Sequence, residues 1–225
     1  MTPFPRNALV IGASGGIGAA FAERLDASSR VIRLSRRDDG VDITDEAAVA
    51  AAAARLEAER FDLILVASGV LESEGAGPEK SFAAIDPAAM ARLYAVNAIG
   101  PALIVKHFAP LLPARGRSVI AFLSARVGSI GDNRLGGWMG YRASKAALNQ
   151  IVRCAGVELS RTRPDAIALA LHPGTIDTAL TRKFAGGRFT ATPEECAENL
   201  LRRCVHATPE MSGRFFAYDG AAVPW

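Results

Sequence analysis

Residues 118–149, SVIAFLSARVGSIGDNRLGGWMGYRASKAALN, combine a predicted strand, a glycine-rich loop and the start of a predicted helix. Ser118–Leu123 is short and apolar, which is typical of a buried strand, and it ends at Ser124. From Tyr141 onward the apolar residues recur with helical spacing, so Tyr141 and Lys145, four positions apart, share one face of the helix. A strand that delivers a hydroxyl group to a site and is then followed by a helix is typical of a parallel α/β sheet.

The Tyr141 and Lys145 pair indicates proton-transfer chemistry. An ammonium group beside a phenol favours the phenolate and lowers a phenol pKa that begins near 10. Such a phenol can exchange a proton with a carbonyl or alcohol oxygen, and Ser124 is the second group that we expect to hydrogen-bond that oxygen. Tyr-x-x-x-Lys is also the pattern of a surface helix with a half-buried tyrosine and a solvated lysine. The interpretation therefore depends on the other motifs of the chain.

A phosphate-binding unit is predicted near the N-terminus. The apolar strand Asn7–Ile11 is followed by the glycine loop Gly12–Gly18 and the helical run Ala19–Leu25. Glycines allow a tight turn and a close backbone approach, while a helix N-terminus supplies N–H donors and the positive end of a dipole. The loop reads G-x-x-x-G-x-G, with a first gap longer than in the commoner dinucleotide fingerprint. A purely structural turn is the alternative interpretation.

The tip of the next strand, Val31–Leu34, indicates which dinucleotide is bound. Ser35 and Arg36 stand directly after this strand, and the acids Asp38 and Asp39 come later. An acid at the tip favours the 2′-hydroxyl of NAD, whereas an arginine accommodates the 2′-phosphate of NADP. The sequence therefore favours NADP(H) over NAD(H), and the alternative is a solvated arginine pair.

The remaining predicted elements continue the alternation of strands and helices. They are an edge segment Val41–Thr44, an alanine-rich helix Asp45–Arg60 capped by Thr44, a strand Phe61–Ala67, a long helix from Asp86 and Pro87 to Leu112, a strand Asp165–Leu171, a helix from Thr192 to about His206, and a strand Gly213–Tyr218. The strands are apolar without a period of two, which is typical of strands buried on both faces. We therefore expect an α/β fold, a doubly wound (Rossmann-type) parallel sheet flanked by helices, as a single domain over residues 1–225.

Composition limits the classes of function. The 225-residue chain is 50% hydrophobic and 22% charged with a net charge of +3, and its basic residues are scattered, so nothing requires a nucleic-acid partner. Cys154, Cys196 and Cys204 lack CxxC spacing and are interpreted as reduced thiols, with no metal site and no disulfide framework. The N-terminus lacks the pattern of a secretion signal, so we expect a cytoplasmic protein.

One apolar stretch, Leu93–Leu112, is long enough to resemble a membrane span. However, Asn97, Lys106 and His107 interrupt it, together with Gly100-Pro101. A buried amphipathic helix with a kink fits this pattern better than a membrane segment does. No membrane partner is expected.

Taken together, these motifs resemble those of the short-chain dehydrogenase/reductases. The matching features are Gly12-x-x-x-Gly16-x-Gly18, Asn97 in VNAIGP, Ser124, Tyr141-x-x-x-Lys145 and Pro173-Gly174-x-Ile176-x-Thr178. They occur in the family's order between residues 7 and 218. The stretches GPEKS, GSIGDN and the ending YDGAAVPW further resemble the C-factor-like subgroup of that family.

The resemblance implies roles for individual residues. Tyr141 is expected as the acid/base, Lys145 as the group that holds the nicotinamide ribose, Ser124 as the group that orients the substrate carbonyl, and Asn97 as a helix kink that supports a proton-relay water. Expected cofactor contacts are Gly12, Ser14, Gly16, Ile17 and Gly18; Ser35 and Arg36; Asp42 and Ile43; Ser68 and Gly69; Asn97, Tyr141 and Lys145; and Pro173, Gly174, Ile176 and Thr178. The alternatives are core packing for Ile176, a turn acid at Asp42 and a backbone-bonded buried amide at Asn97.

The sequence also departs from the family pattern. Ser68-Gly69 stands where the family usually has Asn-Asn-Ala-Gly, Gly15 lacks the basic side chain of many NADP-preferring relatives, and Ser124 precedes Tyr141 by a longer loop than usual. Ser129 lies nearer to Tyr141 in sequence, but it falls within the loop, so Ser124 at the strand end is the stronger candidate.

Two functions remain open on the sequence. The first is an NADP(H)-dependent oxidoreductase that acts on a small carbonyl or alcohol substrate. The second is an NAD(P)-binding signalling or sensor protein with little turnover. In either case we expect the two long helices, Asp86–Leu112 and Trp138–Arg161, to pair in a homodimer or homotetramer. We also expect a mobile lid over Thr178–Thr192. One hypothesis is that Arg182 or Lys183 contacts an anionic group of the substrate or cofactor, and the alternative is a solvated loop whose cations contact nothing.

Overall fold

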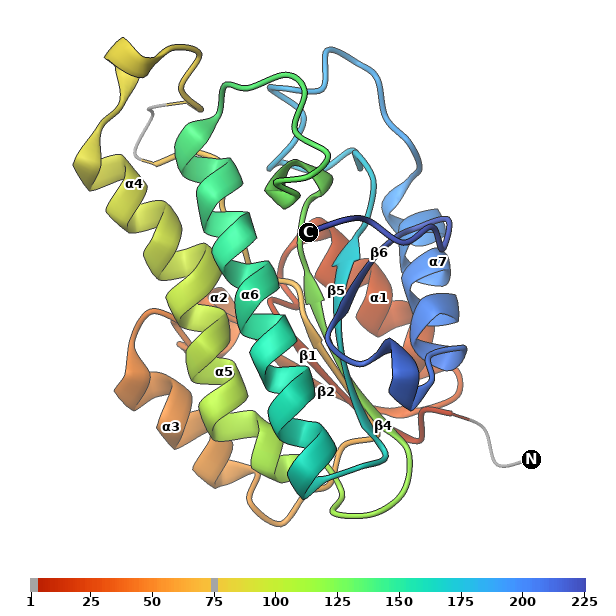
Figure 1. Ribbon diagram of the computed structural model, residues 1–225. Coiled ribbons are helices and arrows are strands. Elements are labelled where there is room, and N and C mark those ends of the chain that lie inside the picture. Colours follow the sequence, from red (N-terminus) through yellow and green to blue (C-terminus); the bar gives the residue numbers. More distant parts are fainter. Residues whose placement is uncertain (1–3, 74–76) are drawn as a thin grey trace.

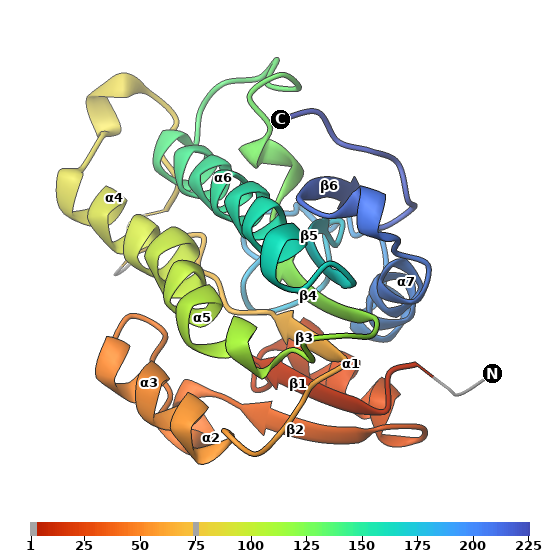
Figure 2. The same ribbon diagram turned by 60° about the horizontal axis from the view of Figure 1, so that its bottom comes forward.

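The sequence alternation produces a six-stranded, fully parallel sheet in a computed structural model that describes residues 4–73 and 77–225. The strands are β1 (Asn7–Ile11), β2 (Arg30–Leu34), β3 (Leu63–Val66), β4 (Ser118–Leu123), β5 (Ala166–His172) and β6 (Arg214–Ala217). Their order across the sheet is β2-β1-β3-β4-β5-β6, so the chain reverses direction after β2 and crosses β1 to form β3. Figure 2 shows this succession from below. The expected doubly wound parallel sheet is confirmed.

Helices cover both faces of the sheet. They are α1 (Gly16–Asp26), α2 (Arg36–Asp39), α3 (Glu46–Arg55), α4 (Pro87–Tyr94), α5 (Gly100–Phe108), α6 (Met139–Thr162) and α7 (Pro193–Val205), with a π-helical segment over Ala95–Ile99 and short 3-10 turns at Phe82–Ala84, Ala109–Leu111, Arg126–Gly128 and Pro209–Met211. Helices α3, α5 and α6 pack on one face, and α1 and α7 pack on the other (Figure 1).

Each face of the sheet has its own apolar core. Alternate residues of β3 divide between the faces: Ile64 and Val66 pack with Phe108 of α5 and Val152 of α6. Leu63 and Leu65 join the opposite cluster with α1 and α7. All four β3 residues are buried, which explains why the sequence shows a continuous apolar run rather than a period of two.

The segment before α3 differs from the sequence prediction. Residues 41–44 form no strand, and Asp45 rather than Thr44 caps α3, since the Asp45 carboxylate accepts hydrogen bonds from the Ala47 and Ala48 amides. The Thr44 hydroxyl instead donates to Asp42 Oδ1 at 2.7 Å. Because the Thr44 side chain is bonded within this turn, the next residue, Asp45, caps the N-terminus of α3.

The long predicted helix after Asp86 is interrupted as expected. Asp86 caps α4 and Pro87 occupies its first turn. The π-helical segment Ala95–Ile99 then separates α4 from α5 at Asn97. By length and composition alone, the run Pro87–Leu111 could cross a membrane. Of its most apolar stretch of 18 residues, 39% is buried inside the protein. Its inner face carries Asn97, Ile104 and Phe108.

Candidate active site

The order of the strands opens a crevice at the carboxyl ends of β1 and β3, where the chain reverses its direction across the sheet. Ligands of open parallel sheets bind at such a switch point. The glycine loop follows β1, Ser68-Gly69 follows β3, Ser124 follows β4, and Pro173-Gly174 follows β5. Motifs far apart in the sequence therefore meet at one edge of the sheet.

The three motif glycines of the first loop each occupy a place with no room for a side chain. A Cβ atom on Gly12, which has a φ of +87°, would lie 2.8 Å from the Ser68 amide nitrogen. On Gly16 it would lie 2.8 Å from Thr178 Cγ2, and on Gly18 it would lie 2.2 Å from the Gly12 carbonyl oxygen. These close approaches bring the first loop against two other predicted cofactor residues, Ser68 and Thr178.

The N-terminus of α1 is suited to an anion. Its N-cap residue, Gly15, provides no side-chain hydrogen bond, and the first turn holds no acidic residue. The first amides of a helix lack partners within the helix and carry the positive end of its dipole. Together with the loop formed by Gly12, Gly16 and Gly18, called the glycine cradle below, this helix N-terminus fits the diphosphate of a dinucleotide.

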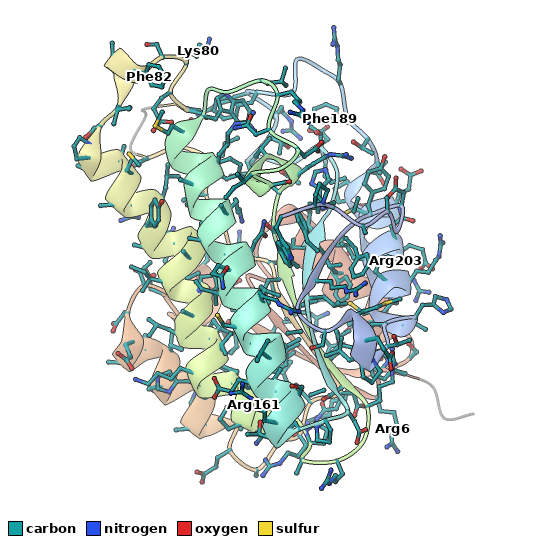
Figure 3. The ribbon with its side chains drawn as sticks, in the orientation of Figure 1. Arg6, Lys80, Phe82, Arg161, Phe189 and Arg203 are labelled. Carbon is teal, nitrogen blue, oxygen red and sulfur yellow. The ribbon has the colours of Figure 1, made fainter. Side chains whose placement is uncertain are left out.

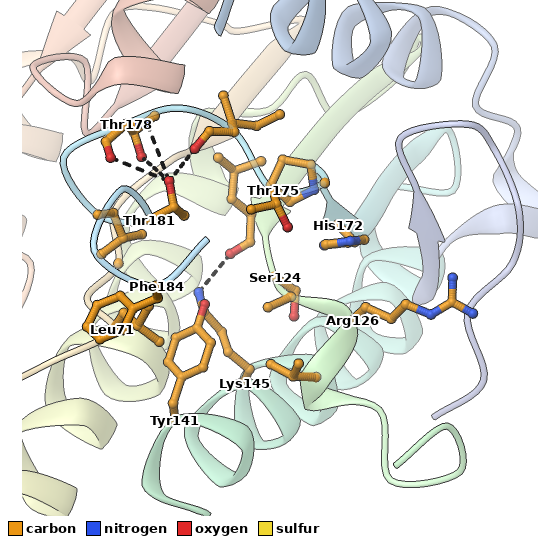
Figure 4. A pocket seen from close by; sticks show the side chains of 18 of the residues that line it. Leu71, Ser124, Arg126, Tyr141, Lys145, His172, Thr175, Thr178, Thr181 and Phe184 are labelled. Atoms are coloured by element: carbon orange, nitrogen blue, oxygen red, sulfur yellow. Dashed lines mark hydrogen bonds between the residues drawn. The ribbon is translucent and has the colours of Figure 1, made fainter. Parts of the chain in front are cut away.

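A cavity of about 680 Å³ extends from this loop to the start of α6. The predicted site residues that line it are Ile17, Ser68, Gly69, Ser124, Tyr141, Lys145, Pro173, Gly174, Ile176 and Thr178. Figure 4 shows Tyr141 and Lys145 rising from α6 on one side, with Ser124, His172 and Thr178 around the same space. The structure therefore brings the hydroxyl, phenol and ammonium groups of the predicted catalytic set to a single cavity.

Asn97 lies behind this cavity rather than in its wall. It is fully buried, its Oδ1 accepts from the Val70 amide at 2.9 Å, and its Nδ2 donates to the Val70 carbonyl at 2.8 Å and to Ser144 Oγ at 3.1 Å. The side chain thus ties the helix to the loop after β3. Both the helix interruption and the backbone-bonded buried amide expected at Asn97 are present, and its support of a proton-relay water stays a prediction.

Lys145 is buried beside Gly69 and donates to the Leu123 carbonyl at 2.9 Å. A Cβ atom on Gly69 would lie 3.3 Å from Lys145 Nζ and from Asn97 Oδ1, so this glycine lets both side chains approach the loop. Burial lowers the pKa of Lys145 to about 8, because a buried ammonium loses its hydration. The group therefore remains mainly protonated at neutral pH.

Tyr141 differs from the sequence expectation in its ionisation. The pattern predicts a phenol whose pKa is lowered by Lys145, but burial raises the pKa of Tyr141 in the structure. Lys145 Nζ lies 5.9 Å from the centroid of the Tyr141 ring. Loss of hydration dominates over the ammonium at this distance, and the phenol is held in its protonated form.

The hydroxyl group of Ser124 is oriented by a residue that the sequence motifs do not include. Ser124 Oγ donates to Asn149 Oδ1 at 2.6 Å, and Asn149 Nδ2 donates to the Gly128 carbonyl at 3.4 Å. Asn149 follows Tyr141 by eight positions and Lys145 by four, so all three side chains lie on one face of α6. A polar residue at this spacing among buried apolar neighbours is the signal that could have identified it.

His172 is a second residue that sequence reasoning missed. It closes β5, immediately before Pro173-Gly174, and lines the cavity. Its Nδ1 atom is buried and has no hydrogen-bond partner among the described residues. Burial, aided by the nearby positive charge of Arg126, lowers the pKa of His172 to about 4, so the ring is neutral at pH 7. Its position directly before a motif at a strand end was the available signal.

The remaining predicted cofactor residues lie at the tip of β2 and outside the cavity wall. The Gly12 amide donates to the Leu34 carbonyl, which places the loop with Ser14 beside this tip. Ser35 is buried, and its hydroxyl bonds to Asp38. Arg36 is exposed, with its Nη1 atom 3.8 Å from the Asp42 carboxylate, and Ile43 is buried against Gly100. Hydrogen bonds from Thr44, with a smaller effect of Arg36, lower the pKa of Asp42.

The predicted lid lies over the cavity. Leu180, Thr181, Phe184 and Arg188 line it, and the Phe184 ring meets Trp138 edge-on at 6.0 Å between centroids. The other two lid cations have partners within the protein: Arg182 pairs with Asp177 at 2.8 Å, and Lys183 pairs with Glu72 at 2.8 Å. Contact of Arg182 or Lys183 with a bound anion stays a prediction, and either cation would have to leave its carboxylate partner to make it.

The chain is similar in sequence to a family model and to several characterised proteins. The family model described as enoyl-(acyl carrier protein) reductase matches residues 12–218. The 1-hydroxy-2-glutathionyl-2-methyl-3-butene dehydrogenase of Rhodococcus sp. (strain AD45) is 33% identical over 233 residues, covering 96% of this chain and 98% of that protein. The C-signal protein of Myxococcus xanthus is 37% identical over 142 residues, covering 63% of this chain and 81% of that protein.

Solved structures agree on the fold. The NADPH-bound carbonyl reductase from chicken fatty liver superimposes with a TM-score of 0.81 at 24% identity, covering 98% of this chain and 99% of that one. A short-chain dehydrogenase/reductase from Burkholderia multivorans with bound NADP gives a TM-score of 0.80, also at 24% identity, with 98% and 99% coverage. The matches in sequence over most of the chain lead to one conclusion: the chain belongs to the short-chain dehydrogenase/reductase family and is an oxidoreductase of that family.

Proposed function

We propose that the protein is an NADP(H)-dependent oxidoreductase that transfers hydride between the nicotinamide and a carbonyl or secondary alcohol, with Tyr141 as the acid/base. The observation that carries this proposal is the gathering of Tyr141, Ser124 and Lys145 in one cavity beside the glycine cradle of Gly12, Gly16 and Gly18. The cofactor supplies the hydride chemistry when bound, and the protein residues bind, orient and move the proton.

Tyr141 is suited to donate a proton in the reducing direction. Burial keeps its phenol protonated at neutral pH, and the Lys145 ammonium is the nearby charge that would stabilise the phenolate left after donation. Ser124 lines the same space, and its hydroxyl group, which donates to Asn149 in the structure, can rotate to donate to a carbonyl oxygen instead. The three groups can therefore orient a carbonyl oxygen and supply its proton.

The decisive experiment is Tyr141→Phe, which keeps the ring and removes the transferable proton. General acid–base catalysis contributes roughly 10²–10⁴-fold, so we expect kcat to fall by about that factor while the NADPH dissociation constant stays nearly unchanged. NADPH oxidation should be followed across ketones, aldehydes and quinones, with 1-hydroxy-2-glutathionyl-2-methyl-3-butene tested with NADP in the oxidising direction. Tyr94→Phe on α4 is the matched control. A Tyr141→Phe protein that kept more than about a tenth of wild-type kcat would reject the assignment.

The NADP preference is supported by Arg36. Its side chain is 70% exposed at the tip of β2, with only a 3.8 Å contact to Asp42, so the guanidinium is available to a 2′-phosphate. Arg36→Ala should lower the NADP/NAD affinity ratio by about tenfold, in line with the loss of one charged hydrogen-bonded contact. Arg37→Ala is the matched control, because Arg37 pairs with Asp38. An unchanged ratio in Arg36→Ala would show that this residue does not meet the phosphate.

A second candidate is an NAD(P)-binding signalling protein with little turnover, which the similarity to the C-signal protein favours. The two candidates differ in turnover rather than in cofactor binding. Wild-type protein that bound NADPH but oxidised none of it with any substrate of the screen would favour the signalling role. We also propose a homodimer or homotetramer, because apolar side chains such as Ile99, beside α5, and Val157 of α6 are exposed on the outer side of these helices, next to a groove between them.

A further inference from the structure

The backbone that leads into α6 is unusual. Gly136, Gly137 and Trp138 all have left-handed conformations, with φ values of 62°, 64° and 54°. Glycine adopts this region freely, but tryptophan does not. Trp138 is also the N-cap residue of α6, and its side chain makes no capping hydrogen bond. The first amides of α6 therefore need a partner from another part of the chain.

Glu79 supplies that partner from 61 positions upstream. The Gly140 amide donates to both carboxylate oxygens at 3.2 Å, and the Trp138 amide donates to the Glu79 carbonyl at 2.6 Å. Glu79 is only 8% exposed, and it makes no ion pair with any residue that the structure describes. A carboxylate at a helix N-terminus is stabilised by the helix dipole and by charge-assisted hydrogen bonds.

Gly140 is the residue that lets the carboxylate approach. A Cβ atom at this position would lie 2.7 Å from Glu79 Oε1, closer than real contacts allow. The hydrogen bonds from Gly140 to Glu79 thus depend on both residues. Figure 3 shows Lys80 and Phe82, which follow Glu79, at the same end of the molecule as the start of α6.

The contact with Glu79 acts on two parts of the site. Tyr141 is the next residue after Gly140, so the position of that amide fixes the first turn from which the phenol projects. Trp138 meets the Tyr141 ring edge-on at 6.3 Å and lines the cavity. Glu79 is not among the residues that line the cavity, so it does not touch the reacting atoms.

We propose that Glu79 is a positioning residue, whose carboxylate fixes the start of α6 and thereby holds the Tyr141 hydroxyl and the Trp138 wall in their working geometry. This inference rests on the proposed function of Tyr141. It predicts that the length of the side chain and its acceptor oxygens matter more than its charge, because a neutral amide oxygen can also accept from Gly140.

Two substitutions separate length from charge. Glu79→Asp keeps the charge but withdraws the acceptor by one methylene, and a misplacement of about 1 Å can cost roughly 10²-fold in rate. We therefore expect kcat to fall about 10- to 100-fold in Glu79→Asp, with an NADPH dissociation constant within about twofold of wild type. Glu79→Gln keeps the length and one of the two acceptor oxygens, and it should retain kcat within about threefold, since the remaining oxygen can still accept from Gly140.

The matched control is Asp86→Ala, which removes the side-chain cap of the neighbouring helix α4. It should lower thermal stability and leave kcat unchanged. Hydrogen exchange of the segment 138–141 gives a readout that does not need activity: it should quicken in Glu79→Asp and stay at the wild-type rate in Asp86→Ala. Wild-type kcat in Glu79→Asp, or a larger loss in Glu79→Gln than in Glu79→Asp, would overturn the proposal.

The test also distinguishes failure of the underlying function. If wild-type protein oxidised no NADPH with any substrate, the oxidoreductase proposal would fail, and hydrogen exchange alone would decide the role of Glu79. Unchanged exchange in Glu79→Asp would then reject the positioning role. If wild type turned over and both Glu79 variants matched it, the positioning role would fail while the oxidoreductase proposal stood.

Discussion

Lys145 is the buried ionisable group of the site whose protonation is most sensitive to mildly alkaline pH. Its folded-state pKa of about 8 lies below the ordinary lysine value of 10.5 because burial penalises the ammonium. Between these two values the unfolded chain binds a proton at this side chain and the folded protein does not. The free energy of unfolding therefore rises with pH across this window, and below pH 8 the folded state bears the full cost of burying the charge.

Lys145→Met tests this linkage. Each pKa unit corresponds to about 1.4 kcal/mol, so the free energy of unfolding of wild type minus that of the variant should increase by up to about 3 kcal/mol from neutral pH to pH 10.5. Urea unfolding at several pH values measures the difference. Other titrating groups are common to both proteins and cancel. A difference independent of pH would show that the ammonium is well solvated in the folded protein.

Among the elements around the site, the segment Thr178–Thr192 is anchored near both ends by hydrogen bonds to Thr175 and Ile176, and side-chain contacts hold its middle over the cavity. Lys183 pairs with Glu72, and Phe184 contacts Trp138. Gly186 and Gly187, both with positive φ, form a turn that only glycine enters without strain. The ion pair is largely exposed, so it contributes at most about 1 kcal/mol. We therefore expect the middle of the segment, around Gly186 and Gly187, to open and close.

Limited trypsin digestion tests whether the ion pair between Lys183 and Glu72 restrains the lid. Glu72→Gln removes the partner of Lys183, and loss of up to about 1 kcal/mol should raise the open fraction, and with it cleavage at Arg182 and Lys183, by up to about fivefold. Glu57→Gln, an exposed change away from the lid, is the control. NADPH should slow the cleavage in the wild type. Equal rates in Glu72→Gln, Glu57→Gln and wild type would show that the ion pair does not restrain the lid.

Helix α7 shows how a local motif stabilises an element. Thr192 and Glu195 form a capping box, in which the Thr192 hydroxyl accepts from the Glu195 amide and the Glu195 carboxylate accepts from the Thr192 amide. Loss of an N-cap costs about 1 kcal/mol, so Thr192→Ala should lower Tm by about 2–4 °C for a chain of this size. Calorimetry beside Ser28→Ala, an exposed control, measures it. Equal melting temperatures in the two variants would contradict a stabilising cap.

In the molecule as a whole, one helical face remains without cover in the single chain. Ile99 is 54% exposed beside α5, and Val157 of α6 is 38% exposed. A groove between the two helices is lined by Val105, Ala109 and Leu159, among others. The same groove also carries Lys106, Glu158 and Arg163, and exposed apolar side chains beside charged ones on long helices are compatible with an isologous interface. This supports the proposed association of two or more copies.

Light scattering tests the association. We expect a mass of two or four times the 23.6 kDa chain at micromolar concentration. Ile99→Arg places a charge within the predicted interface and should shift the mass toward one chain, while Val205→Arg on α7 should not. A single-chain mass for wild type would reject the interface.

The fold class and most of the cavity follow from the amino-acid sequence. Strand ends carry their residues to a common edge, so the order of the motifs is enough to place Ser124, Tyr141, Lys145 and Thr178 together. The place of a glycine such as Gly12 in a tight turn can likewise be predicted from the sequence, because such a turn needs a positive φ. These features depend on the periodicity of apolar residues and on local backbone chemistry, and both can be recognised in one amino-acid sequence.

The protonation of Tyr141, the partner of Ser124 and the cap of α6 are set by tertiary packing instead. Burial raises the pKa of Tyr141 because the surrounding core removes water, and no local pattern reports how completely this happens. The contacts of Ser124 with Asn149 and of Glu79 with Gly140 join residues 25 and 61 positions apart. Such contacts depend on how helices pack against the sheet, and their energies are set by distances that spacing in the sequence does not encode.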